Sequence, residues 1–170
     1  MGLQACRESP EMLGVLGDAL LQEVDRLDSR LIQLNWIARC SAPNRDEVNV
    51  HMVVESWAKE KGVEQLQLEP IRASIDPDLI RAALDQLYDN AVAHGGGYVG
   101  TNVRMLGRRL QLEVRDQGKG WPDSIHNWLK DPQLWNGQIA LGLALAQKVA
   151  QAHDGELLLE SGSAALSIPV

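Results

Sequence analysis

An apolar seam runs through the first forty residues of the chain. Ser9-Pro10-Glu11 is typical of a helix start, because Ser can cap, Pro suits the first turn and Glu favours the positive helix end. Pro43 should end the helix, since it lacks an amide proton. We therefore predict one long amphipathic helix over residues 9–42. Its apolar positions recur at alternating steps of three and four: Leu13, Leu16, Leu20, Val24, Leu27, Leu31, Leu34 and Ala38.

From residue 47 onward, the pattern of apolar and polar residues changes to that of short helices and strands. Residues 47–170 predict an α+β fold, a two-layer α/β sandwich that follows the long helix. One helix is expected to start at Asp76-Pro77 and to stop at three successive glycines. Residues 116–140 are expected to be irregular. The remaining predicted elements are strands over 47–50 and 63–68, a helix over 51–61, a hairpin of 98–105 with 109–115, a helix over 141–152, and strands over 156–160 and 164–169.

Composition narrows the classes of function. The chain has 170 residues and a formal net charge of −7, which argues against nucleic acid as a partner. Its two cysteines, Cys6 and Cys40, have no zinc-site spacing and suggest reduced cytosolic thiols. The apolar runs are too short to cross a bilayer, and no secretory signal pattern is present. We expect a cytoplasmic location and no membrane contact by this fragment.

Three short segments carry candidate chemistry. Gln86 and Asn90 project from the same face of a predicted helix, one turn apart. Asp116 then leaves a predicted strand into a loop with glycines at 118 and 120, where backbone can approach a flat ligand. Residues 137–143 open a further helix, whose free amides can receive phosphates.

In this order, the three segments resemble the N, G1 and G2 boxes of the GHKL ATPase superfamily, and their spacing is similar to its histidine kinase branch. The resemblance covers roughly residues 48–170. It implies that the cofactors are ATP and Mg²⁺, that Asn90 holds the metal, and that Asp116 bonds the adenine amino group. It places the following residues in the nucleotide site: Asn90, His94, Asp116, Gly118, Gly120, Leu141, Gly142 and Leu143.

The same resemblance identifies Asn90 and Gln86 as the catalytic pair. Gln86 stands where ATP-hydrolysing relatives use a glutamate base, and an amide cannot accept a proton as a carboxylate does. Fast hydrolysis is therefore not expected. The third box carries Gln138 and Ala140 where the family favours glycine, and Ala93 stands where many relatives have a basic residue.

As an expectation, the resemblance makes the chain the catalytic part of a sensor histidine kinase, whose ATP γ-phosphate goes to a histidine outside this chain. Residues 9–42 look like the second helix of the dimerisation hairpin, and they contain no histidine. The implied partners are the phosphoacceptor helix of the same kinase, a cognate response regulator and a homodimer through residues 13–38. The chain is then the cytosolic part of a sensor that is membrane-anchored or free. The apolar seam could instead dock onto the domain.

Other interpretations stay open at this point. The departures in the third box suit a degenerate domain that acts as a non-catalytic protein-interaction module. A serine kinase that regulates a sigma-factor antagonist has the same fold but needs no leading helix. Trp121, Trp128 and Trp135 lie seven apart, either as part of a lid over the nucleotide or as packing of one short helix.

Overall fold

The first predicted element is confirmed. The computed structural model describes residues 10–131 and 141–170 and shows a helix, α2, over Pro10–Arg39. By its internal contacts the chain separates into two compact units, Met1–Asn35 and Trp36–Val170. Within the described residues, no helix is both long and apolar enough to cross a membrane. Large apolar side chains of α2 are exposed to solvent: Val15, Leu16, Leu20, Leu21, Val24, Leu27, Leu31, Ile32 and Leu34.

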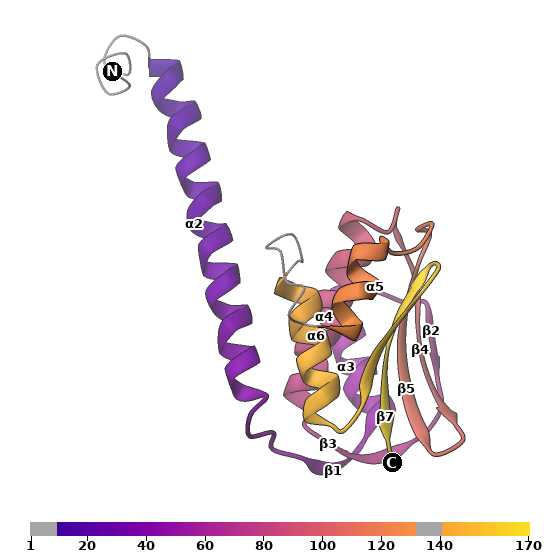
Figure 1. The fold of residues 1–170 in the computed structure, drawn as a ribbon. Coiled ribbons are helices and arrows are strands. Elements are labelled where there is room, and N and C mark those ends of the chain that lie inside the picture. Colours follow the sequence, from indigo (N-terminus) through magenta and orange to yellow (C-terminus); the bar gives the residue numbers. More distant parts are fainter. Residues whose placement is uncertain (1–9, 132–140) are drawn as a thin grey trace. The chain divides into compact units, whose positions relative to one another are not determined.

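The second unit is built on a five-stranded sheet with the strand order β2-β4-β5-β7-β6 (Figure 1). Only β2 and β4 run parallel, and the other neighbours are antiparallel. A second sheet pairs β1 with β3. The elements are β1 Asp46–Asn49, α3 Val50–Lys61, β2 Leu66–Leu68, β3 Arg72–Ile75, α4 Pro77–Ala93, β4 Tyr98–Leu106, β5 Arg109–Asp116, α5 Asp123–Lys130, α6 Leu141–Ala152, β6 Glu156–Glu160 and β7 Ser163–Pro169.

Helices α3 to α6 lie on one face of the large sheet, which makes the two-layer α+β sandwich expected from the sequence (Figure 1). Val103 pairs with Leu112 and Leu112 with Leu166, so three adjacent strands present a buried apolar surface. Against it pack helix residues at 3.6-residue spacing, such as Leu84 and Leu87 of α4. Burying each of these side chains contributes roughly 1.5–3 kcal/mol, so this interface is the main stabilising contact of the unit.

The opposite face of the sheet is polar. Asn102 Nδ2 donates to Glu113 Oε2 at 2.8 Å, and Arg104 Nε donates to Gln111 Oε1 at 2.8 Å, both across the β4–β5 pair. The alternation of apolar and polar residues along these strands therefore separates the core from this face. At one edge of the sheet, β6 begins and ends with an exposed glutamate.

Two predictions for α3 and its neighbours needed correction. The strand expected over 63–68 is shorter, because the Val63 N–H donates to Ala58 O at 3.0 Å to close α3 behind Gly62, whose φ is +69°. That amide cannot enter the sheet. Strand β3 was not predicted, although Ala73 and Ile75 are buried while Arg72 and Ser74 are exposed. Its four residues are too few for a clear period-2 signal.

The stretch expected to be irregular contains a helix, α5. Trp128 is buried on it, and Ile125 and Leu129 are half-buried, so its apolar residues recur at helical spacing. Pro122 precedes its first residue, where a missing amide proton costs nothing. The sequence offered a short helix here only as one interpretation of the tryptophan spacing, because eight residues give a weak periodic pattern.

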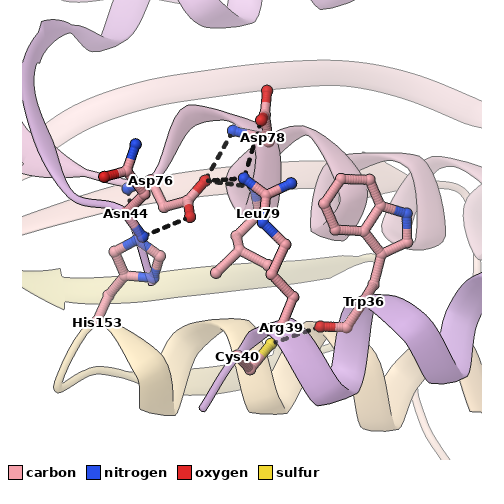
Figure 2. A network of polar contacts seen from close by, with 8 residues as sticks. All are labelled: Trp36, Arg39, Cys40, Asn44, Asp76, Asp78, Leu79 and His153. Carbon is pink, nitrogen blue, oxygen red and sulfur yellow. Dashed lines mark hydrogen bonds and ion pairs between the residues drawn. The ribbon is translucent and has the colours of Figure 1, made fainter. Parts of the chain in front are cut away.

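A buried carboxylate marks the start of α4 (Figure 2). Asp76 Oδ1 accepts the N–H groups of Asp78 and Leu79, both at 3.1 Å, as an N-cap does. Its own N–H donates to His153 Nε2 at 2.9 Å, and His153 Nδ1 lies 2.8 Å from Val149 O. Because Nε2 accepts, Nδ1 must carry the proton and donate to that carbonyl. The network therefore requires a neutral imidazole.

We predict that protonation of His153 destabilises the fold. Burial lowers the pKa of His153, against the opposing hydrogen bond to Val149 O. The folded state then binds fewer protons than the unfolded state, so the stabilisation is fully present above the unfolded pKa of about 6.5 and is lost as the pH falls through the folded pKa. Urea unfolding of the parent and of His153→Gln at a series of pH values measures this contribution. The parent should lose more stability on acidification, and equal slopes would contradict the assignment.

Candidate functional site

A cavity of about 400 Å³ opens at the C-terminal end of α4. Its size lies in the range of small-ligand sites. The loop after β5, the start of α5 and the first turn of α6 complete its wall. The described residues that line it are Asn90, His94, Gly95, Asp116, Gly118, Lys119, Gly120, Trp121, Pro122, Ile125, Leu143 and Gly162.

Most of the residues assigned from the sequence meet in this cavity. Six of them line it together: Asn90, His94, Asp116, Gly118, Gly120 and Leu143. The amide on α4 and the carboxylate at the end of β5 therefore share one cleft, although 26 positions separate them in the sequence. Gln86, Leu141 and Gly142 are not among the lining residues. Gly137, Gln138, Ala140 and Trp135 lie outside the described residues.

Gly142 has a packing role. A Cβ placed on it would come within 2.3 Å of Gln86 Oε1 and 3.2 Å of Gln86 Cδ. The residue is buried, and the absence of a side chain lets α6 approach α4 at this point. Its assignment to phosphate binding stays a prediction.

Asp116 is held by the backbone around it. Its N–H donates to Gly162 O at 2.9 Å, and the N–H of the next residue donates to Gly97 O at 3.2 Å. The Gly118 N–H donates to Asp116 Oδ1 at 2.7 Å, which fixes the carboxylate. Among the described residues no group donates to the second oxygen, Oδ2. That atom is left as an acceptor for a ligand in the cavity.

Two glycines make room for this carboxylate. A Cβ on Gly118 would lie 2.8 Å from Asp116 Oδ1, and a Cβ on Gly95 would lie 2.6 Å from Asp116 Cβ and Cγ. A side chain at either position would displace the carboxylate. The sequence indicated Gly118 through its motif, but Gly95 was interpreted only as a helix stop. Its second role depends on a contact with a residue 21 positions away.

Asn90 has an unsatisfied hydrogen-bonding group. Its Nδ2 is buried and has no hydrogen-bond partner within the described parts of the chain. A buried donor without a partner costs about 1–3 kcal/mol. Such groups in a cavity wall are typical of sites that a ligand completes.

Further lining residues escaped the sequence analysis. The turn residue Gly162 and the exposed Lys119 carried no distinctive signal there. Trp121, which the sequence analysis did name, lines the cavity, and its Nε1 donates to Ser163 O at 3.3 Å, which ties the ring to β7. Trp128, by contrast, is buried in packing. Trp121, Ile125 and Leu143 add apolar side chains to the lining of the cavity.

Comparison with known proteins identifies the family. The model of the histidine kinase-, DNA gyrase B-, and HSP90-like ATPase family matches residues 75–166, more than half of the chain. The chain belongs to this ATPase family. The matched range contains all the residues that line the cavity, so the GHKL resemblance of the sequence is confirmed.

Curated relatives of this GHKL chain are sensor histidine kinases. It is 27% identical over 168 residues to the probable sensor histidine kinase HK of Mycobacterium tuberculosis, which covers 90% of this chain and 44% of that protein. It is 27% identical over 173 residues to the sensor histidine kinase WalK of Bacillus subtilis, across 91% of this chain and 27% of that one. The chain thus spans less than half the length of these relatives.

Solved structures share the GHKL fold. The Acinetobacter baumannii histidine kinase AdeS matches with a TM-score of 0.70 and 20% identity, over 91% of this chain and 84% of that one. Full-length ShkA, solved in complex with AMPPNP, matches with a TM-score of 0.63 and 20% identity, over 95% and 40%. These matches establish the architecture.

We predict that Asn90 is held in place at a cost in stability. Asn90→Leu replaces the unpaired amide with an apolar side chain of similar size, so the free energy of unfolding should rise by about 1 kcal/mol. Urea denaturation without nucleotide measures the change. Asn127→Leu, which removes an exposed amide from α5, is the control and should change stability by less than about 0.5 kcal/mol. A loss of stability in Asn90→Leu would show that the amide has a partner.

Proposed function

We propose that this chain is the ATP-binding catalytic domain of a two-component sensor histidine kinase and that it acts in the cytoplasm. In this proposal residues 47–170 bind ATP, and residues 9–42 are the second helix of the dimerisation hairpin. The observation that carries it is the meeting of Asn90, Asp116 and the loop glycines in one cavity. The sensor kinases among its relatives support it further.

Asp116 would select adenine. Its Oδ2 can accept a hydrogen bond from the exocyclic amine of the base, while Oδ1 stays bonded to the Gly118 amide. The apolar side chains of Trp121, Ile125 and Leu143 suit a flat ring. Gly118 and Gly120 let the backbone approach the base. The AMPPNP complex of ShkA supports the choice of nucleotide.

Asn90 would hold Mg²⁺ next to the phosphates. Its side-chain oxygen is a ligand of the type Mg²⁺ accepts, and Mg²⁺ usually takes few protein ligands in phosphate sites. The unpaired Nδ2 can donate to a phosphate oxygen, so both ends of the amide would be used. The metal supplies charge neutralisation when bound. In this proposal His94, Leu141 and Gly142 lie nearest the phosphates, and Gln86 replaces a hydrolytic base.

The γ-phosphate would go to a histidine on the phosphoacceptor helix of the same kinase, outside this chain. A cognate response regulator would then receive it. The exposed seam of α2 supports a homodimer through residues 13–38, because uncovered apolar side chains of this kind favour association. A net charge of −7 supports the absence of nucleic acid among the partners.

We predict that Asp116→Asn impairs ATP binding. The substitution puts an amide where the carboxylate accepts the adenine amine, and loss of a charge-assisted hydrogen bond should lower the affinity at least about tenfold. Calorimetry with a nonhydrolysable ATP analogue and Mg²⁺ measures it. Asp123→Asn, an exposed position on α5, is the matched control and should bind as the parent does. If neither the parent nor Asp116→Asn binds at millimolar ligand, the non-catalytic interaction module becomes the better interpretation.

We also predict that Asn90 determines the metal dependence of binding. In the parent, Mg²⁺ should increase the affinity for the ATP analogue, because the amide oxygen and the phosphates share the ion. Asn90→Leu should bind with similar affinity with and without Mg²⁺. Paired titrations in Mg²⁺ and in a chelator test this. A Mg²⁺ effect of the same size in Asn90→Leu would place the metal elsewhere.

A further inference from the structure

The chain that leaves α2 is tied to the first turn of α4 (Figure 2). Arg39 Nη2 lies 3.0 Å from Asp78 Oδ2 and 3.7 Å from Asp76 Oδ1. Five residues later, the Asn44 N–H donates to Asp76 Oδ2 at 2.8 Å. The carboxylate that caps α4 therefore also binds the segment from Arg39 to Asn44.

The same segment is tied to the last turn of α6. Arg45 donates to Ala152 O, one of the carbonyls left free at the helix end, and pairs with Asp154 Oδ2 at 2.9 Å. His153, which lies between Ala152 and Asp154 in the sequence, accepts the Asp76 N–H with its ring. The segment is thus held at two helix ends that are themselves joined by a buried hydrogen bond.

Apolar contacts reinforce these polar ones. Trp36, Ile37 and Cys40 are half-buried and pack against the core of the second unit. The Arg39 guanidinium lies 5.0 Å from the centroid of the Trp36 ring, a cation–π distance, and Cys40 Sγ donates to Trp36 O at 3.2 Å. Burial raises the pKa of the Cys40 thiol. A single exposed ion pair contributes little, but here it adds to packing and to a bond with a buried carboxylate.

We infer that the surface formed by the first turn of α4 and the last turn of α6 is a docking site for residues 36–45 of the chain itself. The last turn of α2 and the linker then move as one body with the domain. Any hinge between the two compact units lies in α2 before Trp36, rather than at Pro43, where the helix was expected to end. The boundary between Asn35 and Trp36, inside a continuous helix, agrees with this.

This location of the hinge has a consequence that rests on the proposed function. A kinase that delivers a phosphoryl group to its hairpin must move its catalytic domain relative to that hairpin. With residues 36–45 docked, the motion requires bending of α2 or release of the Asp76 contacts. Arg39 and Asp78 are then positioning residues, remote from the nucleotide.

Hydrogen–deuterium exchange on the full chain, without nucleotide, tests the docking. In the parent, the amides of Cys40 and Asn44 should exchange at least about 100-fold more slowly than in an unstructured peptide. Arg39→Gln should accelerate exchange over residues 40–44 about tenfold and leave β4 and β5 unchanged. Asp78→Asn, which removes the other partner of the ion pair, should do the same. Arg26→Gln, which removes the Glu23 pair on the same helix, is the control and should leave residues 40–44 unaffected.

Two outcomes would overturn the docking site. One is exchange over residues 40–44 in the parent at nearly the rate of a free peptide, while α4 stays protected. The other is unchanged exchange in both Arg39→Gln and Asp78→Asn. Calorimetry with the ATP analogue separates this inference from the function, because Arg39→Gln should bind nucleotide as the parent does. Absent nucleotide binding with full protection of residues 40–44 would refute the function and leave the docking site standing.

Discussion

The buried carboxylate of Asp76 determines where α4 begins, and α4 carries one half of the candidate site. Asn90 follows the cap by 14 positions, which at about 1.5 Å per residue places it roughly 21 Å away. The helix between them is held by Leu84 and Leu87 against the sheet. The position at which α4 begins therefore determines where the Asn90 amide lies in the cavity. The polar network and the candidate site therefore lie at opposite ends of one helix.

The charges in the cavity wall do not all favour the proposed ligand. Asp116 brings a negative charge to a site proposed for a polyanion, and the positive residue at its wall, Lys119, is exposed. The conflict is resolved if the carboxylate faces the base and the phosphates lie toward Asn90. In that arrangement the metal would offset about half of the phosphate charge. Strong nucleotide binding then depends on Mg²⁺ more than on protein cations.

Much of the fold could be predicted from local patterns. The seam of α2, the start of α4 at Asp76-Pro77 and the β4–β5 hairpin each have a signal within a few residues. Strand β3 was missed, and helix α5 was offered only as one interpretation of the tryptophan spacing, because short elements give a weak periodic signal. The parallel pairing of β2 with β4 depends on contacts far apart in the sequence.

The residues of the candidate site likewise fall into those with a local sequence signal and those without one. Asn90, Asp116 and Gly118 were identified because their motifs are contiguous. Gly95 and Gly162 were not, since each owes its place to Asp116, which only the folded chain brings near. Gln86 and Gly142 were assigned to chemistry from their motifs, and this assignment stays a prediction; that the two residues lie next to each other could not be read from the sequence. The link between Asp76 and His153 joins residues 77 positions apart and has no local signal.

The glutamates at both ends of β6 affect how the chain can associate. An edge strand offers unpaired backbone groups to a second strand, and charged side chains oppose that pairing. Copies of the chain are thereby discouraged from joining their sheets edge to edge through β6. The uncovered apolar seam of α2 is then the surface that favours contact between copies. Any association of the chain would thus depend on helix packing, while the exposed glutamates keep this edge of the sheet from pairing with another strand.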